Sequence, residues 1–469
     1  MPARSTGGAA GRQVLALALA AVWTAAGGAA ASTVGIAGDG LPFATHQPSL
    51  TLTPVVQTSG APEQLGRIRW LTSASSGVIP ANLLPADGRS LGAISNLPLA
   101  SQLGNAYGGD AVSFQLPDLR GRAATGTAAD LIRGEASGAA TRTLSEANLP
   151  PHTHDTATGP TEPTGDGAPF HIRQPGLGLV AGIQTEGFFP GPGNDEAPPT
   201  SVGFVSHYAG ATLPAGVTPA DGRLLAPAAE PALFSLFATI YGGDGRDSFG
   251  LPDAQGRLLV GAGQGPGLAP RLIGEQAGAV ERTMTQATMP AHSHPDPDLG
   301  APTDPAGGGQ PISSRQPEIA LTPLIAVTGV YPSESQSYFA DQRILGEIAW
   351  FAGNFAPNGW AIADGSEVNI GDNNALFSLL GTIFGGDGAQ TFALPDLRGR
   401  TLVGVGPDSP YGSAFGSDWL SLTAANLPPH DHAIDRTPAP GVIPLPGALP
   451  LLLGALALLA GCAARRRPG

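Results

Sequence analysis

The feature that most limits how this 469-residue chain can fold is a set of five short motifs that recurs three times in the same order. The motifs are Ala-Asp-Gly, aromatic-Gly-Gly-Asp, Phe-x-Leu-Pro-Asp, Gly-Arg and a closing Pro-x-His-x-His. The second motif, for example, begins at Tyr107, Tyr241 and Phe384. Because internal repeats of this length indicate repeated structural units, we expect three equivalent modules.

A sixth element, Gln-Pro followed by alternating aliphatic residues, precedes each copy at Gln47, Gln174 and Gln316, and none follows the third copy. Such alternation is typical of a strand. The array is therefore permuted, with a leading strand before every module. With these strands included, the predicted units are 36–154, 170–294 and 312–432.

Composition and local pattern predict the secondary structure of each unit. The chain has 68 Gly and 47 Pro but is 42% hydrophobic, which favours short strands joined by tight turns. A helix is expected over 374–384, with Leu376, Leu379, Leu380 and Ile383 on one face, ended by the following glycines. The predicted class is α+β and β-rich, with three repeated modules of short strands plus one short helix each, and terminal hydrophobic segments.

The segments between copies, such as 156–169 and 295–310, are rich in Gly, Pro, Asp and Thr. This composition predicts flexible or surface loops. Cys462 is the only cysteine, so a disulfide within the chain is excluded.

Taken together, the motifs resemble the phage tail collar domain, including the microcystin-dependent protein type, over roughly residues 36 to 435. The third copy matches best, with Phe351-Ala-Gly-Asn-Phe-Ala-Pro-Asn-Gly-Trp360 and Leu394-Pro-Asp-Leu-Arg-Gly-Arg400. The first copy lacks the Phe-Ala-Gly and Trp elements, and the second has Gln255 where the others have Arg. The resemblance implies a structural module, in which the first two copies keep the fold with some surface function lost.

The closing His-x-His is the strongest candidate for chemistry. In an extended segment, residues two apart point to the same side, so two imidazoles can bind one metal ion, although a stable site needs more ligands. In the phage fibres that this module resembles, such pairs from three chains meet on a threefold axis around zinc or iron. The candidate ligands are His152, His154, His292, His294, His430 and His432.

Three hypotheses for these histidines stay open. One chain can fold as a pseudo-trimer in which all six share one site. Three chains can instead form a homotrimer with three stacked sites. In the third hypothesis the motif is inherited turn chemistry, hydrogen-bonded and free of metal.

Two further sets of repeated residues are interpreted as structural. Aromatic-Gly-Gly-Asp is interpreted as a helix-ending turn rather than a calcium site, because calcium-binding repeats are stacked in tandem. Each Leu-Pro-Asp is expected to form a loop-fixing salt bridge with the following Gly-Arg. The turn residues are Gly108, Gly109, Asp110, Gly242, Gly243, Asp244, Gly385, Gly386 and Asp387. The charge pairs are Asp118 with Arg122, Asp253 with Arg257, and Asp396 with Arg400.

Several functions are disfavoured. Five of the 23 basic residues lie in the terminal segments, so the remaining 18 face 37 acidic residues, which argues against binding nucleic acid. The sequence contains no Gly-x-Ser-x-Gly, P-loop or His-Glu-x-x-His, and no enzyme activity is predicted. Trp70 and Trp419 are interpreted as packing residues rather than glycan platforms.

The two ends predict export. Arg4, Arg12 and the apolar run 14–22 form a signal peptide over 1–31, with an uncleaved anchor as the alternative. Residues 442–469 combine Val-Ile-Pro-Leu-Pro, an apolar run and a basic end, which resembles the VPLPA/PEP-CTERM sorting signal processed by an exosortase-type enzyme. A permanent membrane span is the alternative.

These inferences predict a non-enzymatic structural or adhesive protein, exported to the cell envelope or surface, with membrane attachment through the C-terminal segment, release after processing and self-association as further expectations. The alternative is a phage-fibre-like, receptor-binding component with a His-x-His metal site.

Overall fold

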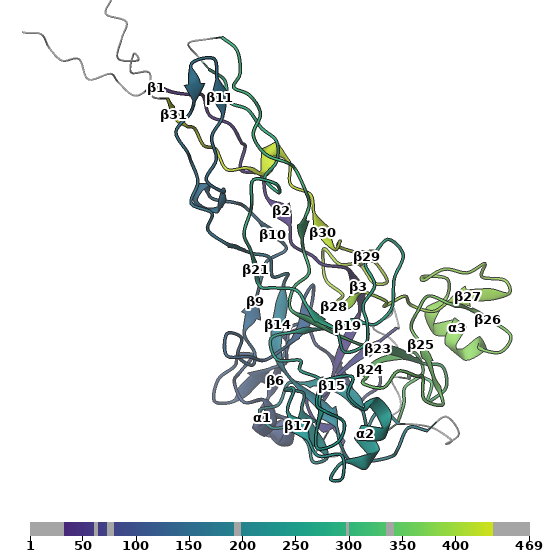
Figure 1. Cartoon of the computed structure of the whole chain (residues 1–469). Coiled ribbons are helices and arrows are strands. Elements are labelled where there is room, and N and C mark those ends of the chain that lie inside the picture. Colours follow the sequence, from purple (N-terminus) through teal and green to yellow (C-terminus); the bar gives the residue numbers. More distant parts are fainter. Residues whose placement is uncertain are drawn as a thin grey trace, which may run out of the picture.

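The computed structural model describes residues 32–60, 64–72, 79–191, 198–296, 300–333 and 342–434. The predicted signal peptide (1–31) and sorting segment (442–469) lie outside the described residues. Within the described part, no helix has the length and apolar character needed to cross a membrane. The described chain forms a broad head and a narrow stalk, and β1 (Ser32–Thr33) pairs with β31 (Ala433–Ile434) at the tip of the stalk (Figure 1).

A 15-stranded sheet forms the centre of the head, and its strands occur in sets of three related by the repeat. Long strands lead each copy: β3 (Ser49–Gln57), β14 (Gly176–Gln184) and β23 (Glu318–Ala326). Next come β4 (Ile68–Leu71), β15 (Phe204–Tyr208) and β24 (Glu347–Phe351), and then β5 (Leu83–Pro85), β16 (Val217–Pro219) and β25 (Trp360–Ile362). The Gly-Arg motif leads into β8 (Ala123–Gly126), β19 (Leu258–Gly261) and β28 (Thr401–Gly404). Short edge strands follow: β9 (Ala136–Ser137), β20 (Gln276–Ala277) and β29 (Ala414–Phe415).

Strand pairing closes the three copies into a ring and explains the permuted array. The second half of each long strand pairs antiparallel with its own copy, as β3 does with β4 and β5. The first half pairs in parallel with the preceding copy: β14 with β8, and β23 with β19. The leading strand β3 has no preceding copy and pairs instead with β28 of the third, in the register Ser49–Thr401. The leading strand of the first copy therefore completes the last module.

The three Gly-Arg strands contact one another in the middle of this ring, and each ends in a glycine. A Cβ added to Gly126, Gly261 or Gly404 would lie about 2 Å from a backbone carbonyl oxygen of the neighbouring copy. Only glycine permits this approach of backbone to backbone. The close contact keeps the three copies equivalent around one pseudo-threefold axis.

The expectation of an α+β fold is wrong, because the fold is made mostly of strands and its helices are too short to form a layer. The described residues contain three seven-residue helices: α1 (Leu97–Leu103), α2 (Pro231–Phe237) and α3 (Asn374–Leu380). They lie at the periphery of the head (Figure 1). The helix expected to reach residue 384 ends after Leu380, because Gly381 adopts a φ of 54°. Ile383, expected on its buried face, is 46% exposed.

Each helix lies between the strands of an outer hairpin. The hairpins are β6 (Ser90–Gly92) with β7 (Ser113–Gln115), β17 (Leu224–Leu225) with β18 (Phe249–Gly250), and β26 (Glu367–Asn369) with β27 (Thr391–Ala393). Short 3₁₀ turns occur at η3 (Ile94–Asn96), η4 (Glu146–Asn148) and η5 (Ala424–Asn426). Leu376 and Leu380 of α3 are buried in the main hydrophobic core.

The stalk consists of the described parts of 32–46, 138–173, 278–315 and 416–434. Short antiparallel pairs join the segment that enters each copy to the one that leaves it. They are β2 (Phe43–Ala44) with β10 (Thr141–Arg142), β13 (Phe170–His171) with β21 (Glu281–Arg282), and β22 (Ile312–Ser313) with β30 (Trp419–Leu420). A separate core of ten buried apolar side chains, including Phe43, Phe170 and Ile312, fills the stalk.

The segment 156–169 and the described part of 295–310, expected to be flexible or surface loops, run along the stalk, where most of their side chains are exposed or half-buried. The first contains β11 (Asp155–Thr156) paired with β12 (Gly159–Pro160) at its start. Their backbones then pair with the His-x-His segments, as His152 does with Thr164 and His292 with Ala306. The content of Gly and Pro predicted loops, whereas the backbone pairing with other segments of the stalk decides the structure.

Candidate metal centre

The three His-x-His segments lie side by side inside the stalk. Each is held by a backbone bridge to a neighbouring strand, and the third bridge joins His430 to Ala37 of the N-terminal segment. The N-terminal segment thus takes the place that 161–164 and 303–306 take for the first two copies. All six histidines are buried, with at most 6% of any one exposed.

An inner triad of rings comes from the first histidine of each pair: His152, His292 and His430. Nε2 of His292 lies 3.2 Å from that of His152 and 3.1 Å from that of His430. In each ring, Nδ1 lies 2.9 to 3.0 Å from the carbonyl oxygen two residues earlier, at Pro150, Pro290 or Pro428. The repeated proline before the motif therefore supplies the acceptor that orients the inner ring.

An outer triad comes from the second histidines: His154, His294 and His432. Here Nδ1 contacts a carbonyl oxygen of a neighbouring segment, at 2.8 Å from Asp304, 2.7 Å from Gly35 and 2.9 Å from Glu162 respectively. Nε2 of each outer ring is buried and, among the described residues, has no hydrogen-bond partner. Unpartnered buried polar atoms are uncommon in folded proteins.

These contacts fix the protonation of the rings. A carbonyl oxygen only accepts hydrogen bonds, so each Nδ1 carries the proton, and Nε2 of a neutral ring presents a lone pair. Burial lowers the pKa of His292 and His432 to about 4 and that of His294 to about 3. Burial also lowers the pKa of His152 and His154. At neutral pH these rings therefore direct lone pairs at one another, which is unfavourable without a cation among them.

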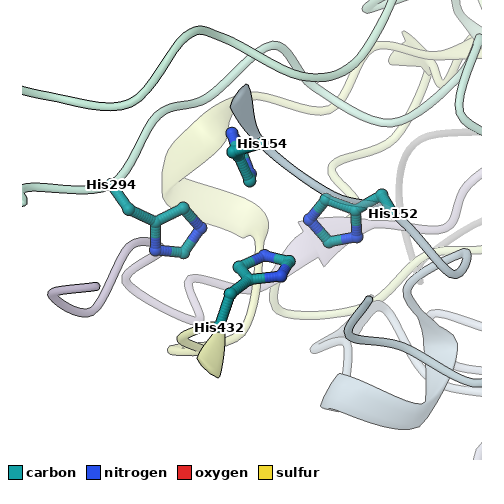
Figure 2. Close-up of side chains that lie close together, drawn as sticks. All are labelled: His152, His154, His294 and His432. Atoms are coloured by element: carbon teal, nitrogen blue, oxygen red, sulfur yellow. The ribbon is translucent and has the colours of Figure 1, made fainter. Parts of the chain in front are cut away.

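The cluster fits a transition-metal ion. Two overlapping sets of four histidines, His152 with His154, His294 and His432, and His152 with His292, His294 and His430, each have ligand nitrogens within 4.8 Å of one another. Figure 2 shows the rings of the first set converging on one point. Six nitrogens about 2.1 Å from one ion would lie ~3 Å apart along the edges of an octahedron, close to the observed Nε2 separations. Metal-binding histidines usually donate their other ring N–H to a carbonyl or carboxylate oxygen, which fixes the ring orientation, and each Nδ1 here makes such a hydrogen bond.

The structure thus brings together all six histidines singled out from the sequence, and it does so within one chain. Sequence reasoning did not identify the carbonyl groups of Gly35, Glu162 and Asp304, because a backbone acceptor leaves no mark on residue identity. The sequence offered one indirect signal for these acceptors. Because the His-x-His pair occurs three times, each pair should lie beside an equivalent backbone segment.

The aromatic-Gly-Gly-Asp residues form tight turns far from the histidines. Every glycine of the three pairs has a φ between 89° and 124°. The carboxylate that follows closes the turn: Oδ1 of Asp387 accepts backbone N–H groups of residues 389 to 391 at 2.7 to 2.9 Å, and Asp110 and Asp244 do the same locally. These hydrogen bonds lower the pKa of Asp387 to about 2. The turn does not end the helix as expected, since α3 stops earlier.

The expected charge pairs form in two copies. Arg122 lies 3.2 Å from Asp118, and Arg257 lies 3.2 Å from Asp253. In the third copy the guanidinium that contacts Asp396 belongs to Arg398, at 2.9 Å, rather than to Arg400. All these pairs are partly exposed and bridge residues of one loop, which suits a structural role.

The family model for the phage tail collar domain matches the chain three times, at residues 66–124, 203–259 and 346–402. The three matches together span less than half of the chain, and each falls within one of the three repeats. The matched residues run from β4, β15 and β24 through the three helices into the starts of β8, β19 and β28. The long strands β3, β14 and β23, the edge strands and the stalk with its histidines lie outside them. No curated protein and no solved structure matched the chain.

Proposed function

We propose that this chain is a non-enzymatic structural or adhesive protein of the cell surface, in which three collar domains form one head on a metal-stabilised stalk. The single observation that carries the proposal is the convergence of six buried Nε2 lone pairs, each fixed by a hydrogen bond at Nδ1. Such a cluster has no evident use except to hold a cation.

The ion that suits the six ligands best is a divalent transition metal, iron or zinc. Imidazole nitrogen binds both, but structural zinc is almost always four-coordinate. A six-nitrogen set therefore favours iron. We propose that the ion is held by six ligands, His152, His154, His292, His294, His430 and His432. The ion would then join the three His-x-His segments of the stalk.

We also propose that one chain is the functional unit. The N-terminal segment pairs with the third copy in the stalk at β1 with β31 and in the head at β3 with β28. A homotrimer built of these chains would have to open this ring or stack three closed ones. The closed ring supports a monomer with one ion.

Metal content and native mass of the full protein test this proposal together. We expect a monomer that contains one equivalent of iron or zinc, with six nitrogen ligands by X-ray absorption spectroscopy. His294→Ala should lose the metal, whereas His171→Ala should keep it, because the side chain of His171 is 53% exposed and lies outside both ligand sets. A metal-free monomer would refute the metal centre, and a trimer would refute the single-chain unit.

The predicted ends of the chain separate the surface role from its alternative, a receptor-binding component of a phage-like particle. The shape, a head on a stalk, suits both roles. A signal peptide and a sorting tail suit only the first. We expect the protein in envelope fractions, accessible to protease added to whole cells; recovery only with particles would favour the alternative.

A further inference from the structure

Three equivalent seams join the leading segment of one copy to the closing segment of the copy before it. The same backbone hydrogen bond occurs in each: Ala139 N donates to Arg173 O, Ala279 N to Arg315 O, and Ser417 N to His46 O. The third seam is the one at which the first segment of the chain meets the last copy. Because the backbone is the same in the three seams, the seams differ only in their side chains.

The first two seams carry charged side chains. Arg173 pairs with Asp130 at 2.7 Å, and Arg315 pairs with Glu275 at 2.9 Å and Glu318 at 2.6 Å. Paired charges of this kind fill the surface of a seam and hold water around it.

The third seam replaces these charges with aromatic rings. His46 stands where the others have Arg, and Phe415 stands where they have Ser137 and Ala277. The two rings meet edge to face, with centroids 5.1 Å apart. Trp419 stands where the strands of the other copies have Thr141 and Glu281, as the equivalent pairings β30 with β22, β10 with β2 and β21 with β13 show.

These rings line a notch of about 420 Å³. The described residues that line it include Phe43, His46, Phe415, Ser417, Trp419 and Ser421, and the others are alanine, glycine and leucine. None of them is an acid, a lysine or an arginine, although the chain has a net charge of −14. Trp419 is 54% exposed, whereas Trp70 in the head is 4% exposed. The interpretation of Trp70 as a packing residue is consistent with its burial, and Trp419 does not share that burial.

We infer that this notch binds a neutral hexose ring of a glycan. The apolar C–H face of a pyranose packs on an indole ring, while its hydroxyl groups need polar partners at the edge. His46, Ser417 and Ser421 offer such groups beside Trp419. The volume lies within the range of small-molecule sites, and such sites combine apolar walls with a few polar groups.

The uncharged lining selects the class of sugar. A carboxylated or sulfated glycan would find no cation in the notch and would approach a chain with an excess of acid. A neutral sugar avoids both costs. Burial lowers the pKa of His46, which keeps that side chain neutral as well.

The inference names a ligand for the proposed adhesive role and rests on that role only for its biological use. Saturation-transfer NMR on the full protein tests it, with maltotetraose, cellotetraose and chitotetraose as neutral probes and tetragalacturonate as the acidic one. We expect at least one neutral probe to bind with a Kd of about 1 mM or tighter. Trp419→Ala should weaken that binding at least tenfold, and Trp419→Phe should retain most of it.

Matched controls come from the other two seams. Thr141→Ala and Glu281→Ala alter the corresponding positions and should leave binding unchanged. Absence of binding by all three neutral probes, preference for tetragalacturonate, or equal binding by Trp419→Ala would each overturn the inference. Metal content and native mass are measured on the same samples, so a failure of sugar binding is distinct from a failure of the proposed metal-stabilised monomer.

Discussion

The head and the stalk contain the same three repeats but are stabilised in different ways. In the head, a continuous core runs from Leu50 to Leu402, and every central strand is paired on both sides. In the stalk, the described residues provide a core of ten apolar side chains and strand pairs of two residues each. Six imidazole rings are buried beside that core, together with other side chains such as Val34, Thr161 and Thr303.

This difference indicates that the head can fold on apolar burial alone, whereas the stalk cannot. Burial of a large apolar side chain contributes about 1.5–3 kcal/mol before conformational entropy is subtracted. Ten such side chains spread along the length of the stalk contribute little net free energy of folding. Repulsion among the six imidazole lone pairs reduces the stability of the stalk further. We therefore expect the ion to decide whether the stalk is ordered.

Removal of the metal should produce the largest effect. Structural metal sites can contribute on the order of 10 kcal/mol, so a chelator should unfold the stalk and leave the head folded. Hydrogen exchange measured by mass spectrometry distinguishes the two regions by peptide. We expect peptides from 416–434 to lose protection while those from 318–326 keep it.

The matched variants are His432→Ala and His171→Ala. The first should reproduce the effect of the chelator even when metal is present, and the second should not. Equal protection of stalk peptides with and without metal would contradict a stalk that depends on the ion.

Acid should have the next largest effect, and it should act mainly on the stalk. The pKa values of about 4 for His292 and His432 and about 3 for His294 lie below the ordinary value of 6.5 for an unfolded chain. Between these values the unfolded state binds protons that the folded state excludes, so the free energy of unfolding falls as the pH falls. Stability is fully present above pH 6.5 and is lost progressively toward pH 4.

A metal-loaded sample should lose stalk protection on acidification, because protons compete with the ion for the imidazole nitrogens, whereas a chelated sample should already lack that protection at pH 7. The head has a smaller contribution of the same sign, because burial lowers the pKa of His207 to about 4. A stalk whose protection is constant from pH 7 to pH 4 would contradict the prediction.

Within the head, the largest single substitution effect should come from a buried ion pair. Nε of Arg69 donates to Glu347 at 2.8 Å, and both side chains are 1% exposed. Glu347→Ala leaves the guanidinium buried without its partner, which typically costs 3–5 kcal/mol. Chemical denaturation of the full protein, followed by hydrogen exchange in head peptides, measures this loss.

Asp87→Ala is the control, because its pair with Arg89 at 2.6 Å lies at the surface and should contribute at most about 1 kcal/mol. The buried pair also joins the first copy to the third, the two copies that chain connectivity does not hold together. A loss in Glu347→Ala no larger than in Asp87→Ala would show that the ring does not depend on this contact.

The head could be predicted from the sequence better than the stalk. Repeated motifs revealed three modules, the leading strands and the six histidines, because each depends on residue identity at fixed spacing. The helices were overestimated, since the apolar periodicity of Leu376, Leu379, Leu380 and Ile383 continues past Gly381, where the backbone turns. The stalk was not predicted, because its two-residue strands are too short to show alternation and most of them pair with segments about a hundred or more positions away.

The smallest expected effect on the free energy of unfolding comes from substitutions at the residue that ends each helix. The first and third copies have Gly104 and Gly381 there, both with a φ of 54°, whereas the second has Ala238 with a φ of 43°. A side chain in this region of φ is strained, so Ala238→Gly should raise the free energy of unfolding of the head by about 1 kcal/mol. Gly381→Ala should lower it by a similar amount, and because a Cβ at Gly381 would meet nothing within 4 Å, the loss would report backbone strain alone. The stalk should respond to neither substitution, and any change in its protection would show that the two regions do not unfold separately.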